Sequence, residues 1–470
     1  MLTTVVLIPA FIAAYFAFTH SPHKAFLNVY VPTLLLFPPY YQWKPPFIPD
    51  PNFYEAAVIP IILAFLVRGM PGWKFTLTDV FVLGFTFFIS TSEYINYGYK
   101  DAQNLMARML LSVICPYVLA KSLIEPAGLR IEFAKRIVLV LFIISFFLVY
   151  ENHFRTGYTV WQSALGRFFD FGWARAVRFR WGMARANGPF IHPIQAGIIM
   201  VIGFQLHQWL VWNRAWPSQL KNFSLPFFTV PQIMTIVLLF GVFAPLSRAP
   251  WLGLILIGGV IFVLSIIVSF SKKPLVRYLI ILAMIGGIVI GAMGMNEAFN
   301  QFASVGREEA GETSQERRTI AYRFELYITY GEIVLDRWVW GWGRMGWPKD
   351  TVQPSVDNAY LFLALNHGLI AVGCLLALFF FIMLKLFAHI MSQPAMTPAK
   401  SALAITLLSL FVHEFFCLAT VSLNTTNLTL LFIIIGWSDG YLHNRKEHKS
   451  QVSVTDNQNS KLPFKFRRFM

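Results

Sequence analysis

Apolar runs of about 17–25 residues recur along nearly the whole chain, and each could cross the roughly 30 Å of hydrocarbon in a lipid bilayer. Of the 470 residues, 56% are hydrophobic and only 13% are charged. A soluble domain has about 25% charged residues, so this composition could not cover a water-exposed surface. The sequence therefore predicts an all-α, polytopic membrane protein.

The runs predict about twelve transmembrane helices. Residues 3–19 lack a charged leader and a cleavage site, so we interpret them as a retained span and not as a signal peptide. Residues 25–37 form a short run followed by a proline-rich stretch that cannot be helical throughout, and we interpret them as a partial or re-entrant segment. The clearer spans are expected at 53–68, 75–92, 104–124, 135–152, 189–212, 226–246, 250–270, 276–297, 357–388, 399–417 and 424–443. Residues 1–442 would form one transmembrane domain, and residues 443–470 a basic cytoplasmic tail.

The short loops predict the topology, because cytoplasmic loops are enriched in Lys and Arg. If the spans alternate, most basic loops fall on one side, which should be the cytoplasm, with both termini there. Two large intervals, 153–188 and 298–356, then face outward.

The outward interval 153–188 is unexpectedly basic and aromatic. Phenylalanines and tryptophans interleave its arginines, as in amphipathic segments that lie in the headgroup plane. Arginine suits bidentate phosphate contact, which favours an anionic lipid-linked ligand over nucleic acid. Simple interfacial anchoring is the alternative for each arginine. The arginines are Arg155, Arg167, Arg175, Arg178, Arg180 and Arg185.

The second outward interval contains a predicted amphipathic helix at residues 315–337. At 100° per residue, its polar and apolar side chains fall on opposite faces, so we expect it to lie on the membrane surface. Arg317, Arg318 and Arg323 would face substrate, unless they only form a solvated surface. A turn rich in tryptophan and glycine follows at residues 338–347 and should re-enter the membrane at headgroup depth.

Candidate chemical residues gather at the outer ends of spans. Few ionisable residues lie near span centres, where they are costly and functional, which argues against an ion-driven transporter. Arg185, Arg248 and Asp357 instead suggest a site for a lipid-bound diphosphate with a base beside it. His413 and Glu414 form a second candidate base pair, or else a buried and satisfied pair.

Four motifs occur in order on the expected outer face: Arg185-Ala-Asn-Gly-Pro-Phe-Ile-His-Pro193, Leu246-Ser-Arg248, Arg317-Arg318 with Trp340-Gly-Trp-Gly343, and Asp357-Asn-Ala-Tyr-Leu361. Together they resemble the O-antigen ligase/O-antigen polymerase family over about residues 180–375. The resemblance implies a glycosyltransferase of the integral-membrane GT-C type in the bacterial inner membrane, with its active site facing the periplasm. The donor would be a glycan on undecaprenyl diphosphate and the acceptor a sugar hydroxyl of a glycan or of lipid A core, with no metal or cofactor.

The resemblance also assigns roles to residues. Arg185 and Arg248 match the paired arginines of the family, which would hold the diphosphate. Asn358 and Tyr360 belong to the last motif and, together with Arg178 and Arg180 of the basic interval, are expected to line the substrate site. Asp357 stands where ligases have histidine. A carboxylate is ionised at neutral pH and can accept a proton, but it is a weaker base than histidine. We therefore expect direct displacement with inversion, with Asp357 as base or acceptor-orienting group.

Alternatives remain open on the sequence alone. A polymerase and a ligase are not distinguished, and a chain-length or export partner is possible. A flippase for lipid-linked sugars would show internal repeats and broken helices in matching halves, and no clear repeat is visible. A non-catalytic subunit of a polysaccharide export complex would tolerate loss of both arginines. The three cysteines form no CxxC pair and suggest neither a disulfide framework nor a zinc site.

Overall fold

The computed structural model describes residues 3–46, 49–154, 157–169, 178–219, 228–269, 326, 329–344, 346–348, 356–392, 398–422 and 425–459, with the backbone alone given for 269, 398–402 and 445–459. Within these ranges the chain is almost entirely helical and contains one two-stranded hairpin. The expected span at 276–297 and the arginines Arg317, Arg318 and Arg323 lie outside the described residues.

The helices follow the apolar runs. Their bounds are α1 Ile8–Thr19, α2 Pro22–Ala25, α3 Val31–Leu36, α4 Phe53–Val67, α5 Leu77–Tyr97, α6 Tyr99–Met109, α7 Cys115–Leu123, α8 Arg130–Phe154, α9 Val160–Leu165, α10 Pro193–Trp212, α11 Val230–Phe243, α12 Arg248–Ser269, α15 Ala359–Met391, α16 Pro398–Leu418 and α17 Thr425–Asn459. Single turns of 3₁₀-helix, η1 Thr3–Leu7 and η4 Gly166–Phe168, precede α1 and follow α9. The π-turns η2 Phe26–Tyr30 and η3 Leu110–Ile114 join α2 to α3 and α6 to α7.

Five helices in the described part are long and apolar enough to cross a bilayer: Tyr99–Leu123, Arg130–Phe154, Pro193–Trp212, Arg248–Val268 and Ala359–Met391. Shorter apolar helices cover Thr3–Thr19, Phe53–Val67, Val230–Phe243 and Leu403–Leu418. The chain is thus an all-α protein with membrane helices, whereas the count of about twelve spans stays a prediction. The run expected to be partial is one helix from Pro22 to Leu36, about 22 Å long, which is shorter than the hydrocarbon thickness.

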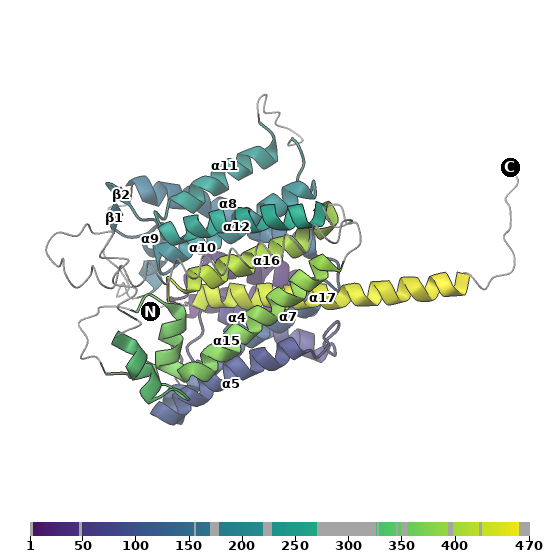
Figure 1. The fold of residues 1–470 in the computed structure, drawn as a ribbon. Helices are drawn as coiled ribbons and strands as arrows, with labels where there is room; N and C mark the ends of the chain where they lie inside the picture. Colours follow the sequence, from purple (N-terminus) through teal and green to yellow (C-terminus); the bar gives the residue numbers. More distant parts are fainter. Residues whose placement is uncertain are drawn as a thin grey trace, which may run out of the picture.

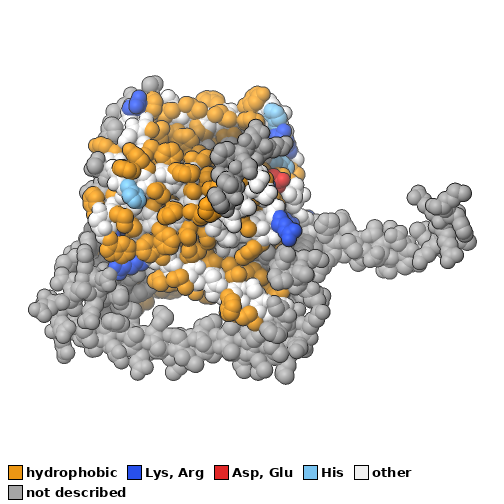
Figure 2. All heavy atoms as spheres, turned by 90° about the horizontal axis from the view of Figure 1, so that it is seen from above, with side chains coloured by type: hydrophobic (Ala, Val, Ile, Leu, Met, Phe, Trp, Pro, Cys, Tyr) orange, Lys and Arg blue, Asp and Glu red, His pale blue; other side chains and the backbone are white. Residues whose placement is uncertain are grey.

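The surface of the bundle is apolar. Side chains such as Phe11, Val67, Ile255 and Phe262 are at least 66% exposed. Figure 2 shows one face covered by hydrophobic side chains, with the described charged side chains at its edges. A water-soluble protein does not expose so large an apolar surface, and lipid is the solvent that this surface fits.

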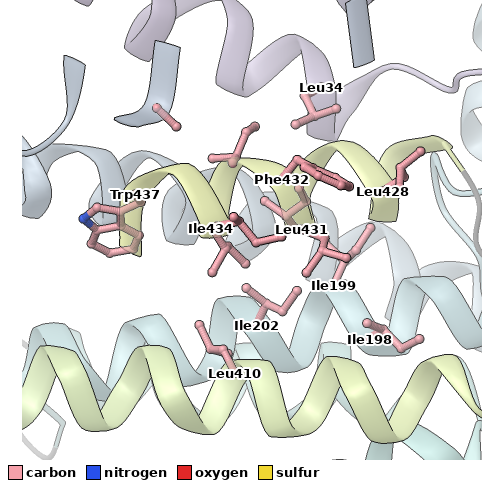
Figure 3. Close-up of a cluster of buried hydrophobic side chains, with 14 of the residues drawn as sticks. Leu34, Ile198, Ile199, Ile202, Leu410, Leu428, Leu431, Phe432, Ile434 and Trp437 are labelled. Atoms are coloured by element: carbon pink, nitrogen blue, oxygen red, sulfur yellow. The ribbon is translucent and has the colours of Figure 1, made fainter. Parts of the chain in front are cut away.

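The helices lie roughly side by side, with α8 and α11 at one edge and α5 at the other (Figure 1). Helix α17 fills the middle, where its residues 428–437 meet α10 and α16 (Figure 3). Gly436 and Gly440 let α17 approach α7 closely. A Cβ at Gly436 would lie 2.3 Å from Tyr117 O, and a Cβ at Gly440 would lie 2.5 Å from Lys121 O. Contact between small residues and a neighbouring backbone is how membrane helices pack without a hydrophobic driving force.

The two ends of the bundle carry different features. At one end, the ammonium of Lys135 lies over Trp216 and the guanidinium of Arg130 over Tyr441. We call this the tail end, because α17 extends from it (Figure 1). The opposite end carries the hairpin and is called the hairpin end. These contacts join the start of α8 to the segment after α10 and to α17. These segments, which the topology expects at the cytoplasmic side, therefore meet at one end of the bundle.

Lys121 is a charged residue inside the bundle, near the end of the expected span 104–124. It lies in α7 and is only 3% exposed. Its Nζ is 2.6 Å from Asp79 Oδ2 on α5 and 3.0 Å from Asp439 Oδ2 on α17. The hydroxyls of Thr76 and Thr78 donate to Asp439, both at 2.8 Å. This buried ion cluster therefore ties α5, α7 and α17 together.

Candidate functional site

The hairpin is the one structured element that the predicted all-α fold did not foresee within the described ranges. Strands β1 Phe179–Arg180 and β2 Met183–Ala184 pair antiparallel. Trp181 and Gly182 connect them with φ of 53° and 75°. Positive φ at both central residues is typical of the tight turns that join two strands. Two strands of two residues leave no periodicity to detect, and only the Trp-Gly pair could have indicated the turn.

Arg185 directly follows the hairpin and is held by the turn before α12. Its backbone N–H donates to Arg178 O at 2.9 Å, which closes the base of the hairpin. Its side chain is buried, and Nη2 donates to Ser247 Oγ at 2.9 Å while Nε donates to Pro245 O at 3.4 Å. Burial, followed by the nearby Arg180 and Arg178, lowers the pKa of Arg185 to about 10. The guanidinium therefore remains a cation at neutral pH, and an anionic ligand beside it would stabilise this charge.

Arg180 and Arg248 complete the same junction. Arg180 Nη1 donates to Leu246 O at 2.6 Å. Arg248 is the first residue of α12 and is exposed. The structure thus brings together the two motif segments that carry Arg185 and Arg248, two residues that are 63 positions apart in sequence. Arg178 is exposed at the start of the hairpin.

The end of α8 joins these segments, a role that sequence reasoning missed. Asn152 Nδ2 donates to Ala184 O at 2.8 Å and to Ala244 O at 3.0 Å. Glu151, only 1% exposed, accepts hydrogen bonds from the backbone N–H groups of Asn187 at 3.2 Å and Gly188 at 2.9 Å.

The ends of α12, α15 and α16 also meet. Cys417 Sγ, near the end of α16, lies 3.9 Å from Ala249 O, the residue after Arg248. Two residues earlier, Phe415 O accepts a hydrogen bond from the hydroxyl of Tyr360 at 3.0 Å. The last turn of α16 therefore contacts both the start of α12, which carries Arg248, and the start of α15, which Asp357 precedes.

Asp357 is exposed and stands immediately before the cap of α15. Asn358 caps that helix, with its Oδ1 accepting from Leu361 N at 3.0 Å. The Asn358 side chain thus has a structural role at this helix end. Its cap orients the start of α15, so that Asp357 sits at the surface of the hairpin end.

His413 and Glu414 lie inside the bundle. His413 is fully buried, and its ring packs so closely on α12 that a Cβ at Gly253 would lie 2.2 Å from His413 Nδ1. Glu414 is 2% exposed, and neither of its carboxylate oxygens has a hydrogen-bond partner among the described residues. Both residues are thus removed from the surface on which Asp357 and Arg248 lie.

The tryptophan turn is built into the bundle. Helix α15 breaks at Gly368, with φ of 83°, so that residues 359–367 and the longer part run in different directions (Figure 1). Leu369 N donates to Trp338 O at 2.6 Å across the break. Trp342 N donates to Leu365 O and Gly343 N to Asn366 O, both at 2.8 Å. The tryptophan turn is therefore hydrogen-bonded to α15 at the break in that helix.

The predicted helix at 315–337 is described only at residue 326 and from 329 onward. Residues 329–336 are helical, and Leu326, Tyr330 and Val334 are buried while Glu332 and Asp336 are exposed. This part is amphipathic, as expected. Within the described ranges, no group of three or more His, Cys, Asp or Glu side chains is placed to hold a metal ion.

Residues 233–376 match the family model described as O-Antigen ligase. Over these residues, which are less than a third of the chain, the protein is similar to the O-antigen ligase family. The match confirms the family that the motifs suggested, and it contains both Arg248 and Asp357, whereas Arg185 lies before it. No curated protein matches the chain. The O-antigen ligase family and the apolar helices together indicate a bacterial membrane protein with a glycosyltransferase-like activity that uses a lipid-linked glycan donor.

Proposed function

We propose that this O-antigen ligase-like protein transfers a glycan from undecaprenyl diphosphate to a sugar hydroxyl on the periplasmic face of the inner membrane. The observation that carries the proposal is the junction of the hairpin with the turn before α12. There, the buried Arg185 of one motif is held by Ser247 of a second motif, and this second motif ends in the exposed Arg248. Two cations gathered from separate motifs at one bundle end suit a diphosphate at the membrane surface.

Arg185 and Arg248 would stabilise the leaving group. As the bond between the anomeric carbon and the diphosphate oxygen breaks, negative charge develops on the diphosphate. Cations that are fixed before the reaction stabilise that charge without reorganising, and the low dielectric beside lipid strengthens their effect. Arg185 is fixed in this sense by Ser247 and Pro245.

Asp357 would accept the proton of the attacking hydroxyl. The acceptor oxygen forms a bond to the anomeric carbon from the face opposite the diphosphate, its proton passes to the carboxylate, and undecaprenyl diphosphate departs. This direct displacement inverts the anomeric configuration. The exposed position of Asp357 beside the last turn of α16 supports this role, because an acceptor arriving from water can reach it.

Substitution of the two exposed residues tests the proposal. Arg248→Ala and Asp357→Ala should each abolish glycan transfer in cells without lowering the amount of membrane-inserted protein. Arg214→Ala, an exposed arginine after α10 at the tail end, is the matched control and should leave transfer unchanged. Unchanged polymer length and yield in both site variants would refute the assignment, as would reporter fusions that place residues 298–356 in the cytoplasm.

The glycan profile of a deletion strain separates the two activities within the family. Accumulation of lipid-linked single repeats would identify a polymerase. Long chains that stay on the lipid carrier and do not reach lipid A core would identify a ligase.

A further inference from the structure

A polar cavity opens at the hairpin end, apart from the paired arginines. It has a volume of about 170 Å³ and lies between the start of α4, helix α6 and the tryptophan turn. Its polar lining consists of Asp50, Glu55, Asn104, Arg108 and Arg344. Pockets for drug-sized ligands begin at about 300 Å³, so this cavity suits a smaller group such as a single sugar ring.

Each arginine of the cavity is held by a buried glutamate. Arg108 Nε is 3.8 Å from Glu55 Oε1, and Glu55 is only 2% exposed. Arg344 Nε is 3.5 Å from Glu93 Oε1, while the backbone N–H of Arg344 donates to Glu93 Oε2 at 3.0 Å. Glu93 is likewise 2% exposed. Each guanidinium of the cavity thus has a buried carboxylate as its ion-pair partner.

Glu55 is itself fixed at the first turn of α4. Its Oε2 accepts from Asn52 N at 3.0 Å, and its Oε1 accepts from Ser112 Oγ at 2.8 Å. The Glu55 carboxylate thus has three partners: the backbone N–H of Asn52 in the capping box, the hydroxyl of Ser112 and the guanidinium of Arg108. The cavity wall is therefore rigid on the side of α4.

The remaining polar side chains are available to a ligand. The side chains of Asp50 and Asn104 line the cavity and make no hydrogen bond or ion pair with any other described residue. A carboxylate accepts, guanidinium groups donate, and an amide does both, which together match the hydroxyls of a sugar. Two carboxylates balance two arginines in the lining, so an anion such as phosphate gains no net attraction.

The cavity is physically connected to the proposed site. Arg344 belongs to the turn whose Gly343 N donates to Asn366 O at the break in α15. Residues 359–367 of that helix run from this turn back to Asp357 and span about 13 Å at 1.5 Å per residue. A glycan that reaches Asp357 with one end could therefore extend along this short helix to the cavity.

We propose that this cavity binds a sugar residue of the acceptor glycan, behind the residue whose hydroxyl reacts. The inference rests on the proposed function and adds a binding site to it. Asp50 and Asn104 would bind the ring hydroxyls, while Arg108 and Arg344 would donate from the walls.

The test measures binding apart from transfer. Full-length protein in lipid nanodiscs is titrated with lipid-free oligosaccharide, released by mild acid from the polysaccharide of the bacterium that carries the chain. Asp50→Asn and Asn104→Ala should each raise the Kd for this probe about ten-fold, since each loses a hydrogen bond to the ligand. Asp101→Asn is the matched control, because Asp101 is exposed on the same helix as Asn104 and does not line the cavity.

Arg248→Ala separates this inference from the proposed function. It should abolish transfer and leave oligosaccharide binding unchanged; if it retains transfer, the proposed function fails, whatever the oligosaccharide does. If wild type, Asp50→Asn and Asn104→Ala bind the oligosaccharide equally, the cavity is not an acceptor site. Competition by millimolar inorganic phosphate would overturn the inference too, because it would identify an anion site.

Discussion

The guanidinium of Arg185 rests on the hydroxyl of Ser247, with 2.9 Å between Nη2 and Oγ. Each residue belongs to a different motif, and Arg248 follows Ser247 in the chain. The hydroxyl therefore fixes the buried arginine relative to the exposed one, which is the geometry that a diphosphate bound by both would need.

Ser247→Ala should lower the rate of glycan transfer about ten-fold. A hydrogen bond to a charged group contributes about 1.5–3 kcal/mol, and its loss frees the guanidinium to leave its position. Transfer is measured with lipid-linked donor in vesicles. Ser247→Thr keeps the hydroxyl and should restore most of the rate; an equal defect in both variants would contradict a hydroxyl-mediated effect.

Asn152→Leu should destabilise the hairpin end. The side-chain amide bridges Ala184 O and Ala244 O, so its removal leaves two carbonyl oxygens with one partner fewer. A buried group without its partner costs about 1–3 kcal/mol. Thermal unfolding in detergent should shift down by several degrees and transfer should fall. His153→Gln, at the exposed neighbour, should change neither.

Gly368→Ala should prevent stable folding. The residue has φ of 83°, and an added Cβ would lie 2.2 Å from Val339 O, so the tryptophan turn would have to leave the break in α15. Gly373→Ala offers a control in the same helix, because nothing lies within 4 Å of its added Cβ. That variant should be as stable as the wild type or more so. Equal melting temperatures for the two variants would show that the turn does not depend on the break.

Lys121→Met should cost about 3–5 kcal/mol of stability, because it leaves Asp79 and Asp439 buried without their cation. The yield of folded protein after detergent extraction is the measurement. Lys121→Met combined with Asp439→Asn should recover part of the loss, whereas Lys135→Met at the surface of α8 should have little effect. A double variant no better than the single one would argue against charge as the cause.

The helices were predictable from the sequence because lipid imposes a length and an apolarity on each span. The motifs also indicated Arg185 and Arg248, and the structure brings their segments together. What escaped prediction depends on contacts between distant segments. Asn152 carries no local signal of its two carbonyl partners. Lys121 likewise carries none of its carboxylate partners, which lie 42 residues before and 318 residues after it.

The acceptor cavity illustrates the same limit. Asp50, Arg108 and Arg344 come from three segments that no periodicity or spacing connects. Single charges near span ends are common at membrane surfaces, so none of them stood out on its own. Only the packing of α4, α6 and the tryptophan turn places them around one space.

The central place of α17 has a consequence for biosynthesis. The helix that completes the interior is the last one to be translated within the described chain, and Gly436, Gly440 and Asp439 all dock against α7 or its lysine. Until Asp439 leaves the ribosome, Lys121 has only Asp79 as a carboxylate partner in this cluster, and α7 lacks its covering helix. The bundle must therefore remain open through most of its insertion, and its final assembly waits for synthesis to reach the C-terminal helix.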